Sequence, residues 1–377
     1  MIGRKKRASD GRKKRTDKTN EKVLMKGNEV FAEAAIRCGC RFYFGYPITP
    51  QNEITEYMAK NLPKVGGAFI QAESELAAVS MAYGAACAGG SVMISSSSPG
   101  IALMQESFSF ICSAALPLLI INISRGGPGV GTIQPGQADY YQATRGGGNG
   151  DYRLIVYAPH SIQEAADMME KAFAVAEAYR NPVMILADGM LGQMMEPVVL
   201  PPEKGAVSED VIRELKPWAL AGHGDARPRN VVRSLYLEAE ELENRSNELA
   251  RKYETAKKEL VEYEAMRLKG AEIVFVSYGS TSRIVMEALD ILAADGIRAG
   301  LIRPVTLWPY PYEAFDAVGK GTKAIFSVEL SQGQMMDDVL IGVRGRWPVS
   351  LINRVGGKLL SPAEVAERAA KILRGGP

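Results

Sequence analysis

The chain has 377 residues, of which 46% are hydrophobic and 23% are charged, and its formal net charge is +2 at pH 7. This composition is typical of a globular protein with room for two domains, and the small net charge indicates no special class of partner. The four cysteines fit neither a paired zinc motif nor a ferredoxin cluster motif, which argues against an iron–sulfur centre in this chain.

Basic residues are concentrated at the start of the chain, where residues 1–22 carry ten lysines and arginines against three acidic residues. Since this stretch lacks apolar periodicity, we predict a disordered basic tail over residues 1–23 and favour it over contact with nucleic acid or a membrane surface. No secretory signal is recognisable, and the longest apolar run, Ile111 to Ile123, contains Pro117 and is too short to cross a bilayer. These features predict a cytoplasmic protein without a membrane partner.

Short apolar runs alternate with longer helical patterns over residues 24–201, as expected for an α/β domain with a parallel sheet. A capping box, Ser161 with Glu164, marks the start of one helix. The predicted strands are Arg41–Gly45, Ala68–Ala72, Ser91–Ser95, Pro117–Ile123, Arg153–Ala158 and Pro182–Ala187.

Residues 202–270 are rich in charged side chains, and we predict a helical linker there, with one or two solvated helices between Leu235 and Arg267. A second, smaller α/β domain is predicted over residues 271–377, ending in a helix that Ser361 and Glu364 open as a capping box. Its predicted strands are Glu272–Ser280, Arg298–Arg303, Lys323–Glu329 and Val349–Val355.

The segment from Tyr46 to Glu53 reads YPITPQNE and follows the first predicted strand of the larger domain. Its two prolines hold Thr49 in a rigid turn at the carboxyl end of a strand, where parallel sheets bind ligands. From the spacing alone, an ordinary connection with Thr49 or Asn52 as a helix N-cap is the simpler interpretation.

Two further charged residues follow predicted strands. Glu75, with Glu73 beside it, comes just before an almost uncharged helix, and simple electrostatics of the first helical turn would also explain an acid there. Arg125 ends an apolar strand and begins a glycine-rich stretch, where a guanidinium is suited to bind a carboxylate or phosphate. A surface arginine is the alternative.

These segments resemble those of the thiamine-diphosphate-dependent 2-oxoacid:ferredoxin oxidoreductases, in the alpha-type subunit that carries the pyrimidine-binding domain. The resemblance extends from about Leu24 to Leu373. It rests on Tyr46 to Glu53, Gln71 to Ala78, Ser97 to Gly100, Arg125 to Gly136, Leu186 to Gly192, Ser277 to Ser280 and Val328 to Gln334.

The resemblance implies a thiamine-diphosphate-binding, pyrimidine-type α/β domain followed by a transketolase C-terminal-like domain. It implies that Glu75 hydrogen-bonds the aminopyrimidine ring and that Thr49 and Arg125 contact the 2-oxoacid. Among the motif residues, those expected to contact the cofactor besides Glu75 are Pro47, Ile48, Ser98 and Pro99.

The family reaction is the coenzyme A-dependent oxidative decarboxylation of a 2-oxoacid, with ferredoxin as the electron acceptor. Asp188-Gly189 is only part of a metal–diphosphate motif, so we expect no metal in this chain. We expect a beta-type partner to hold the diphosphate with magnesium, and gamma-type and ferredoxin-like delta-type partners to complete the complex, with the iron–sulfur clusters on partner subunits.

Gln51 to Glu53 and the linker from Lys252 to Glu264 look most like the 3-methyl-2-oxobutanoate (2-ketoisovalerate) enzymes. Enzymes for 2-oxoglutarate or pyruvate remain alternatives, as does a catalytically silent interaction subunit. The joint presence of Thr49, Glu75 and Arg125 argues against the last of these.

Overall fold

The protein is described by a computed structural model that covers residues 21–205, 208–223 and 227–375. Its larger sheet has seven strands in the order β12-β6-β7-β5-β4-β2-β3, and all but β12 run parallel. Each of the six parallel strands overlaps a strand predicted from the sequence. They are β2 (Phe42–Gly45), β3 (Ala68–Gln71), β4 (Val92–Ser96), β5 (Leu118–Ser124), β6 (Ile155–Tyr157) and β7 (Pro182–Asp188).

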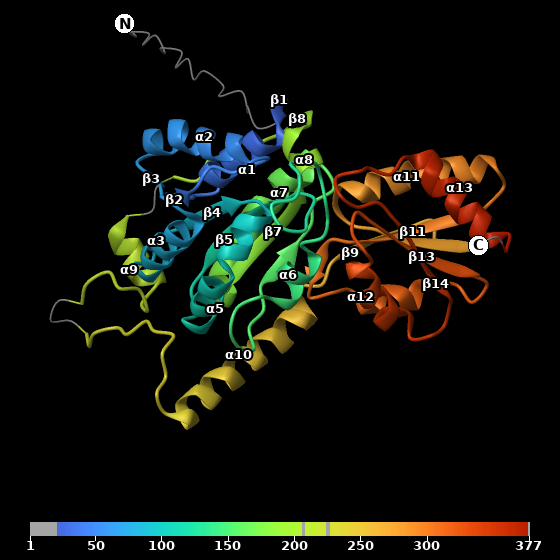
Figure 1. The fold of residues 1–377 in the computed structure, drawn as a ribbon. Helices are drawn as coiled ribbons and strands as arrows, with labels where there is room; N and C mark the ends of the chain where they lie inside the picture. Colours follow the sequence, from blue (N-terminus) through green and yellow to red (C-terminus); the bar gives the residue numbers. More distant parts are fainter. Residues whose placement is uncertain (1–20, 206–207, 224–226, 376–377) are drawn as a thin grey trace, which may run out of the picture.

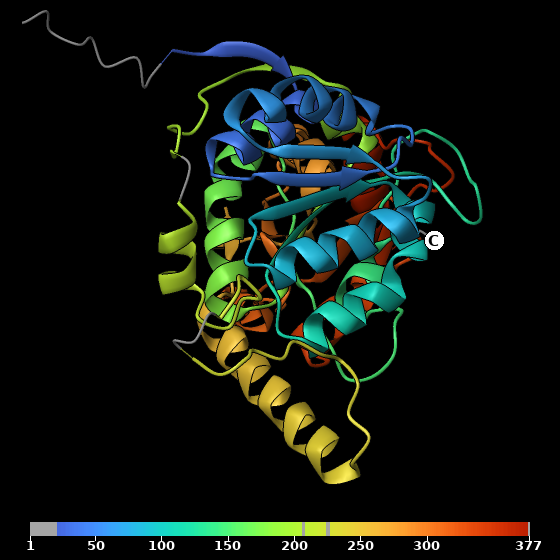
Figure 2. The ribbon, with the colours of Figure 1, turned by 90° about the vertical axis from the view of Figure 1, so that its left-hand side faces the viewer.

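Helices cover both faces of this sheet, which explains why every residue of β4, β5 and β7 is buried. One face carries α1 (Gly27–Arg37), α2 (Asn52–Asn61) and α7 (Ile162–Tyr179), and the other carries α3 (Glu75–Cys87) and α5 (Gln105–Ser113) (Figures 1 and 2). As predicted, Ser161 caps α7, because its Oγ accepts a hydrogen bond from the backbone amide of Glu164.

The second sheet has five strands in the order β14-β13-β10-β11-β9. Four of them were predicted, namely β10 (Ile273–Val276), β11 (Ala299–Pro304), β13 (Ala324–Glu329) and β14 (Val349–Asn353). Helices α11 (Gly279–Ala294) and α13 (Pro362–Leu373) pack together on one face, and α12 (Gln334–Val343) lies on the other (Figure 1).

The helical prediction between Leu235 and Arg267 was partly wrong. Helix α10 (Ala239–Glu259) ends earlier, and Tyr263–Met266 forms strand β9, which pairs antiparallel with β11. The free edge of β11 supplies hydrogen-bonding partners that a local sequence pattern does not show. The second half of α10 is also less solvated than predicted, since Leu249 and Tyr253 are buried, whereas its first half projects from the body (Figure 2).

Strand β12 (Thr306–Trp308) links the two units, because it follows β11 in the chain but pairs with β6 at the edge of the larger sheet. The units also share one hydrophobic cluster, to which the larger sheet contributes Ile120 and the smaller sheet Val276. An ion pair adds to the contact, in which the fully buried Arg303 of β11 donates two hydrogen bonds to the half-buried Glu164 of α7.

The remaining elements are short. Val23–Lys26 forms β1, which pairs with β8 (Met195–Val198), and residues 1–20 of the predicted basic tail lie outside the described residues. The other elements are α4 (Ser98–Leu103), α6 (Tyr140–Arg145), α8 (Gly189–Gln193), α9 (Glu209–Leu215) and the 3-10 helices Leu62–Val65 and Tyr312–Ala317. Within the described ranges, no helix is both long and apolar enough to cross a bilayer.

Candidate functional site

The predicted site residues lie at one rim of the larger sheet, where its parallel strands end. Thr49 follows β2, Glu75 begins the helix after β3, Ser98 follows β4 and Arg125 follows β5. Since β3, β2, β4 and β5 are neighbours in this sheet, four segments that are far apart in sequence come together at the rim where parallel α/β sheets bind ligands.

Hydrogen bonds from the surrounding chain hold the Thr49 turn in place. The carbonyl of Pro50 accepts hydrogen bonds from Asn28 Nδ2 at 2.7 Å and from Gln193 Nε2 at 3.0 Å. Neither Thr49 nor Asn52 is the N-cap of α2, which is Gln51, without a side-chain capping bond. Pro47 is exposed and Ile48 is half-buried, so this part of the turn is accessible to a ligand or partner.

Glu75 is the first residue of α3 and is only 5% exposed, whereas Glu73 is exposed. Its carboxylate accepts no hydrogen bond from the described residues, and the nearby hydroxyl of Ser96 is buried without a partner. A Cβ atom at Gly100 would lie 2.5 Å from Glu75 Oε1 and 2.1 Å from Ser96 Oγ, so only glycine fits there. A buried carboxylate without an internal partner fits a donor from a bound molecule.

Arg125 is buried, which rules out the surface-arginine alternative. Its Nη1 donates to the Thr49 carbonyl at 2.7 Å and its Nη2 to the Val130 carbonyl at 2.8 Å, while its Nε is buried without a partner. The backbone amide of Arg125 donates to Ser98 Oγ at 2.9 Å. Arg125 therefore joins the Thr49 turn, the Ser98 turn and the glycine-rich loop into one unit.

Asp139, a buried acid at the same rim, was not predicted from the sequence. Asp139 Oδ2 accepts hydrogen bonds from Ser98 Oγ at 2.7 Å and from Asn122 Nδ2 at 2.9 Å. Burial raises the pKa of Asp139 above its ordinary value, although the hydrogen bonds from Ser98 and Asn122 oppose the shift. No motif surrounds this residue, so only its contacts reveal it.

Asp188 has a structural role in the described chain. Its Oδ1 accepts from the backbone amides of Met190 and Leu191, and its Oδ2 accepts from Ser280 Oγ of the second unit. Both carboxylate oxygens are therefore engaged by the chain's own donors. Among the described residues, no group of three or more His, Cys, Asp or Glu side chains is placed to hold a metal ion.

Two cavities flank Arg125. One, of about 450 Å³, is lined by Thr49 and by the apolar side chains of Ile133, Met190 and Leu359. The other, of about 490 Å³, is lined by Ser98, Pro99 and Asp139 and reaches the second unit. Neither cavity has a lysine or arginine among its lining residues.

Residues 33–265 match the family described as "Pyruvate flavodoxin/ferredoxin oxidoreductase, thiamine diP-bdg", and residues 271–365 match "Pyruvate:ferredoxin oxidoreductase core domain II". The chain belongs to this family. It is 44% identical to ketoisovalerate oxidoreductase subunit VorB of Methanothermobacter marburgensis, over 93% of this chain and 97% of that protein. It is 36% identical to 2-oxoglutarate synthase subunit KorA of Methanocaldococcus jannaschii, over 92% of this chain and 98% of that protein.

Solved structures agree with this assignment. The structure of 2-oxoglutarate:ferredoxin oxidoreductase from Magnetococcus marinus, with 2-oxoglutarate, coenzyme A and succinyl-CoA bound, is 26% identical with a TM-score of 0.81. That similarity covers 94% of this chain and 65% of that one. A split-gene transketolase, with a TM-score of 0.56 and 16% identity over 93% of this chain and 98% of that one, shares the fold alone.

These findings confirm the predicted family, the fold class and the thiamine-diphosphate-dependent enzyme class. Both curated relatives are subunits by name. Thiamine diphosphate is the cofactor of the family, and the rim fits it, because Glu75 offers a buried carboxylate without an internal partner.

Proposed function

We propose that this chain is the pyrimidine-binding, alpha-type subunit of a 2-oxoacid:ferredoxin oxidoreductase that acts on 3-methyl-2-oxobutanoate. The complex would convert this 2-oxoacid and coenzyme A into an acyl-CoA and carbon dioxide while reducing ferredoxin. The observation that carries the proposal is the arrangement of Thr49, Glu75, Ser98 and Arg125 on one rim of a parallel sheet.

Glu75 is the residue that would hold the aminopyrimidine of thiamine diphosphate. Bound cofactor supplies the carbanion chemistry of the reaction, and the protein supplies orientation and proton transfer. The Glu75 carboxylate is buried beside Gly100, where it can share a proton with a ligand nitrogen without competition from an internal donor. Pro47, Ile48 and Pro99 would line the same ligand, because Pro47 and Ile48 follow β2 and Pro99 lies in the first turn of α4, which follows β4.

Ser98 is expected to position neighbouring groups of the site in addition to contacting the cofactor. Its hydroxyl donates to Asp139 and accepts from the backbone amide of Arg125, so it fixes the start of the glycine-rich loop. Beyond the bonds to Thr49 and Val130, Arg125 has three further N–H groups, of which the one on Nε is buried, and the two on Nη1 and Nη2 would bind the carboxylate of a 2-oxoacid.

The lining of the Thr49 cavity supports a branched-chain substrate. Ile133, Met190 and Leu359 suit an aliphatic side chain, whereas the charged residue among the lining residues is Glu53. The second carboxylate of 2-oxoglutarate would meet this acid instead of a cation, which is unfavourable. The name of the VorB relative agrees with this choice.

Two features indicate the partners. The sequence has neither a complete metal–diphosphate motif nor a cysteine motif for an iron–sulfur cluster, and apolar side chains are exposed near α3. Magnesium and the diphosphate are assigned to a beta-type subunit, and the iron–sulfur clusters to partners that include a ferredoxin-like delta-type subunit, with a gamma-type subunit completing the complex. Apolar side chains on and beside α3, among them Leu76 at 49% exposure and Ile70, support a partner over this face.

A reaction that consumes coenzyme A and reduces ferredoxin also supports the predicted cytoplasmic location.

The decisive experiment is to purify the complex and to follow viologen reduction with 3-methyl-2-oxobutanoate, 2-oxoglutarate and pyruvate, each with and without coenzyme A. We expect coenzyme A-dependent reduction and the highest kcat/KM for 3-methyl-2-oxobutanoate. A preference for 2-oxoglutarate would contradict the substrate assignment alone. Absence of reduction with every 2-oxoacid, in a complex with intact clusters, would contradict the catalytic proposal and favour the silent subunit.

A further inference from the structure

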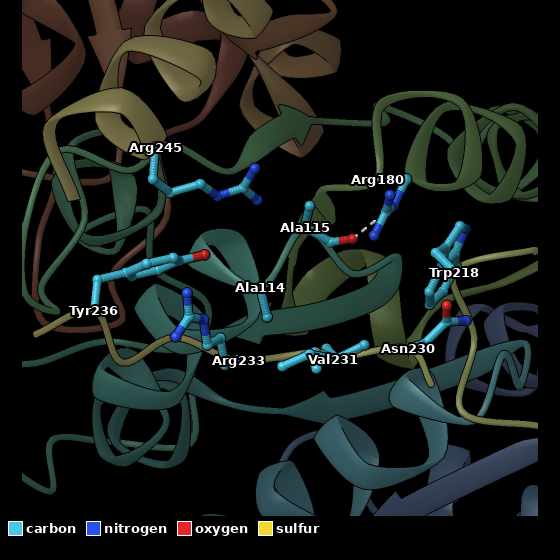
Figure 3. A pocket seen from close by; sticks show the side chains of 10 residues that line it. Ala114, Ala115, Arg180, Trp218, Asn230, Val231, Arg233, Tyr236 and Arg245 are labelled. Carbon is cyan, nitrogen blue, oxygen red and sulfur yellow. Dashed lines mark hydrogen bonds between the residues drawn. The ribbon is translucent and has the colours of Figure 1, made fainter. Parts of the chain in front are cut away.

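A cavity of about 600 Å³ lies at the opposite end of the larger sheet from the rim. It opens beside Ala114 and Ala115, which precede β5, whereas Arg125 follows the other end of that strand. A strand of seven residues is about 20 Å long, so this cavity is separate from the site described above. Its other walls come from Arg180 at the end of α7, from Trp218, from residues 230–233 and Tyr236, and from Arg245 of α10 (Figure 3).

Three arginines from three separate segments point into this cavity (Figure 3). Arg180 ends α7, Arg233 belongs to the segment before α10, and Arg245 lies on α10. Two of the three arginines lie over aromatic rings. The guanidinium of Arg180 lies 4.5 Å from the centre of the Trp218 ring, and the guanidinium of Arg233 lies 4.9 Å from the centre of the Tyr236 ring. Such stacking fixes the plane of each guanidinium.

Part of this arrangement is explained by the fold alone. Arg180 Nε donates to the Ala115 carbonyl at 2.9 Å and Arg245 Nε donates to the Ser113 carbonyl at 2.8 Å, so both side chains satisfy carbonyls at the end of α5. These bonds use the Nε atoms. In the described chain the two amino nitrogens of Arg180 have no hydrogen-bond or ion-pair partner, and Arg245 Nη2 also has none.

The cavity carries more positive than negative charge. None of its lining residues is acidic, although Arg245 pairs with Glu248 at 2.7 Å and Arg233 pairs with Glu241, both exposed acids. Behind the cavity, burial and then the charges of Arg245 and Arg180 lower the pKa of Lys252 to about 8, against the opposing effect of Cys112. Cations that repel one another favour an anion that neutralises them.

We propose that this cavity binds a phosphate-bearing small molecule, held by the free guanidinium nitrogens of Arg180, Arg233 and Arg245. Arginine forks match phosphate oxygens with paired N–H donors, and three of them around one space suit a group with several negative charges. The cavity volume accommodates a diphosphate together with an attached ring system.

Calorimetric titration of the full chain with inorganic pyrophosphate and, separately, with ADP tests the proposal. We expect saturable binding of pyrophosphate that weakens as potassium chloride is raised, because screening reduces charge attraction. Arg180→Gln and Arg233→Gln should each weaken pyrophosphate binding about tenfold, since each removes charge-assisted hydrogen bonds. Two variants are used because Arg180 is also the C-cap of α7, so that its replacement changes the end of a helix as well as the cavity. Arg233 is exposed and caps no helix.

Arg251→Gln is the matched control, because Arg251 is an exposed residue of α10 outside the cavity and its loss changes the net charge equally. This variant should bind pyrophosphate with a Kd within about twofold of that of the unmodified chain, as expected for a distant surface charge. Tighter binding of ADP than of pyrophosphate would support a nucleotide ligand, and equal binding would support recognition of the phosphates alone. Absence of pyrophosphate binding at low salt, or an equal loss in the Arg251 variant, would overturn the proposal.

Discussion

At the scale of single residues, Glu75 offers the sharpest test of the proposed site. Its carboxylate is buried beside Ser96 and Gly100 without an internal donor. In the assembled complex, Glu75→Gln should lower kcat about 100-fold while assembly is unchanged, because an amide cannot take up and release a proton in this role. Turnover by viologen reduction and complex mass by light scattering measure the two effects.

Glu73→Gln is the matched control, since Glu73 lies two residues away and is exposed. It should retain the kcat of the unmodified complex. If Glu75→Gln also kept that kcat, Glu75 would only stabilise the first turn of α3, as the simpler interpretation has it.

Arg125 is the second residue with a defined test. Arg125→Lys keeps the charge but lacks the planar fork that reaches the Thr49 and Val130 carbonyls and binds a carboxylate through two N–H groups, so KM should rise for every 2-oxoacid with little change in selectivity. Arg125→Ala should be worse, because truncating a paired, buried charge costs roughly 2 to 5 kcal/mol. Steady-state kinetics on the three 2-oxoacids would show this.

Arg145 is the alternative cation for the substrate carboxylate. It already pairs with Asp338 at 3.3 Å and lies over the Tyr141 ring, so Arg145→Lys should change KM much less. A larger effect at Arg145 than at Arg125 would reassign the carboxylate contact.

At the scale of elements, the contact between α7 and β11 should make stability depend on pH. Burial alone would raise the pKa of Glu164, but hydrogen bonds from His160 and Arg303 outweigh it and lower this pKa from 4.5 to about 2. The resulting stabilisation, about 3 kcal/mol, is complete above pH 4.5 and is lost as the pH falls toward 2.

Glu164→Gln should therefore lower the free energy of unfolding by about 3 kcal/mol at pH 7, because the fully buried Arg303 loses one of its two carboxylate partners and keeps only Glu264. The difference from the unmodified protein should shrink below pH 4.5, which urea unfolding at several pH values would show. Glu254→Gln is the control, since that exposed acid pairs with Lys257 on the surface of α10 and should leave stability unchanged. Equal effects of the two substitutions would contradict this account.

At the scale of the whole molecule, the site is expected to be divided between subunits. Asp188 uses both carboxylate oxygens for α8 and Ser280, so the described chain offers no acid there for a magnesium diphosphate. The isolated chain should therefore bind thiamine diphosphate weakly, and addition of the beta-type subunit should tighten binding. Calorimetry with magnesium would measure both, and submicromolar binding by the chain alone would contradict the divided site.

The sequence by itself located the parallel strands, the turns that follow them and the residues Thr49, Glu75 and Arg125. These features are local, because buried parallel strands are short apolar runs and rigid turns contain proline and glycine. A resemblance carried by several motifs was then enough to predict the family, which the comparisons confirm. The roles of the three residues remain proposals.

Only the tertiary structure decided which distant segments meet. The pairing of β9 with β11 and of β12 with β6, the hydrogen bonds of Asp139 to Ser98 and Asn122, and the arginine cavity all join residues that the local pattern leaves unconnected. Arg125 was predicted as a cation at the rim, but its bonds to the Thr49 and Val130 carbonyls appear only after folding. Edge pairing and burial of polar groups depend on what packs against a segment, and a one-dimensional pattern does not contain that information.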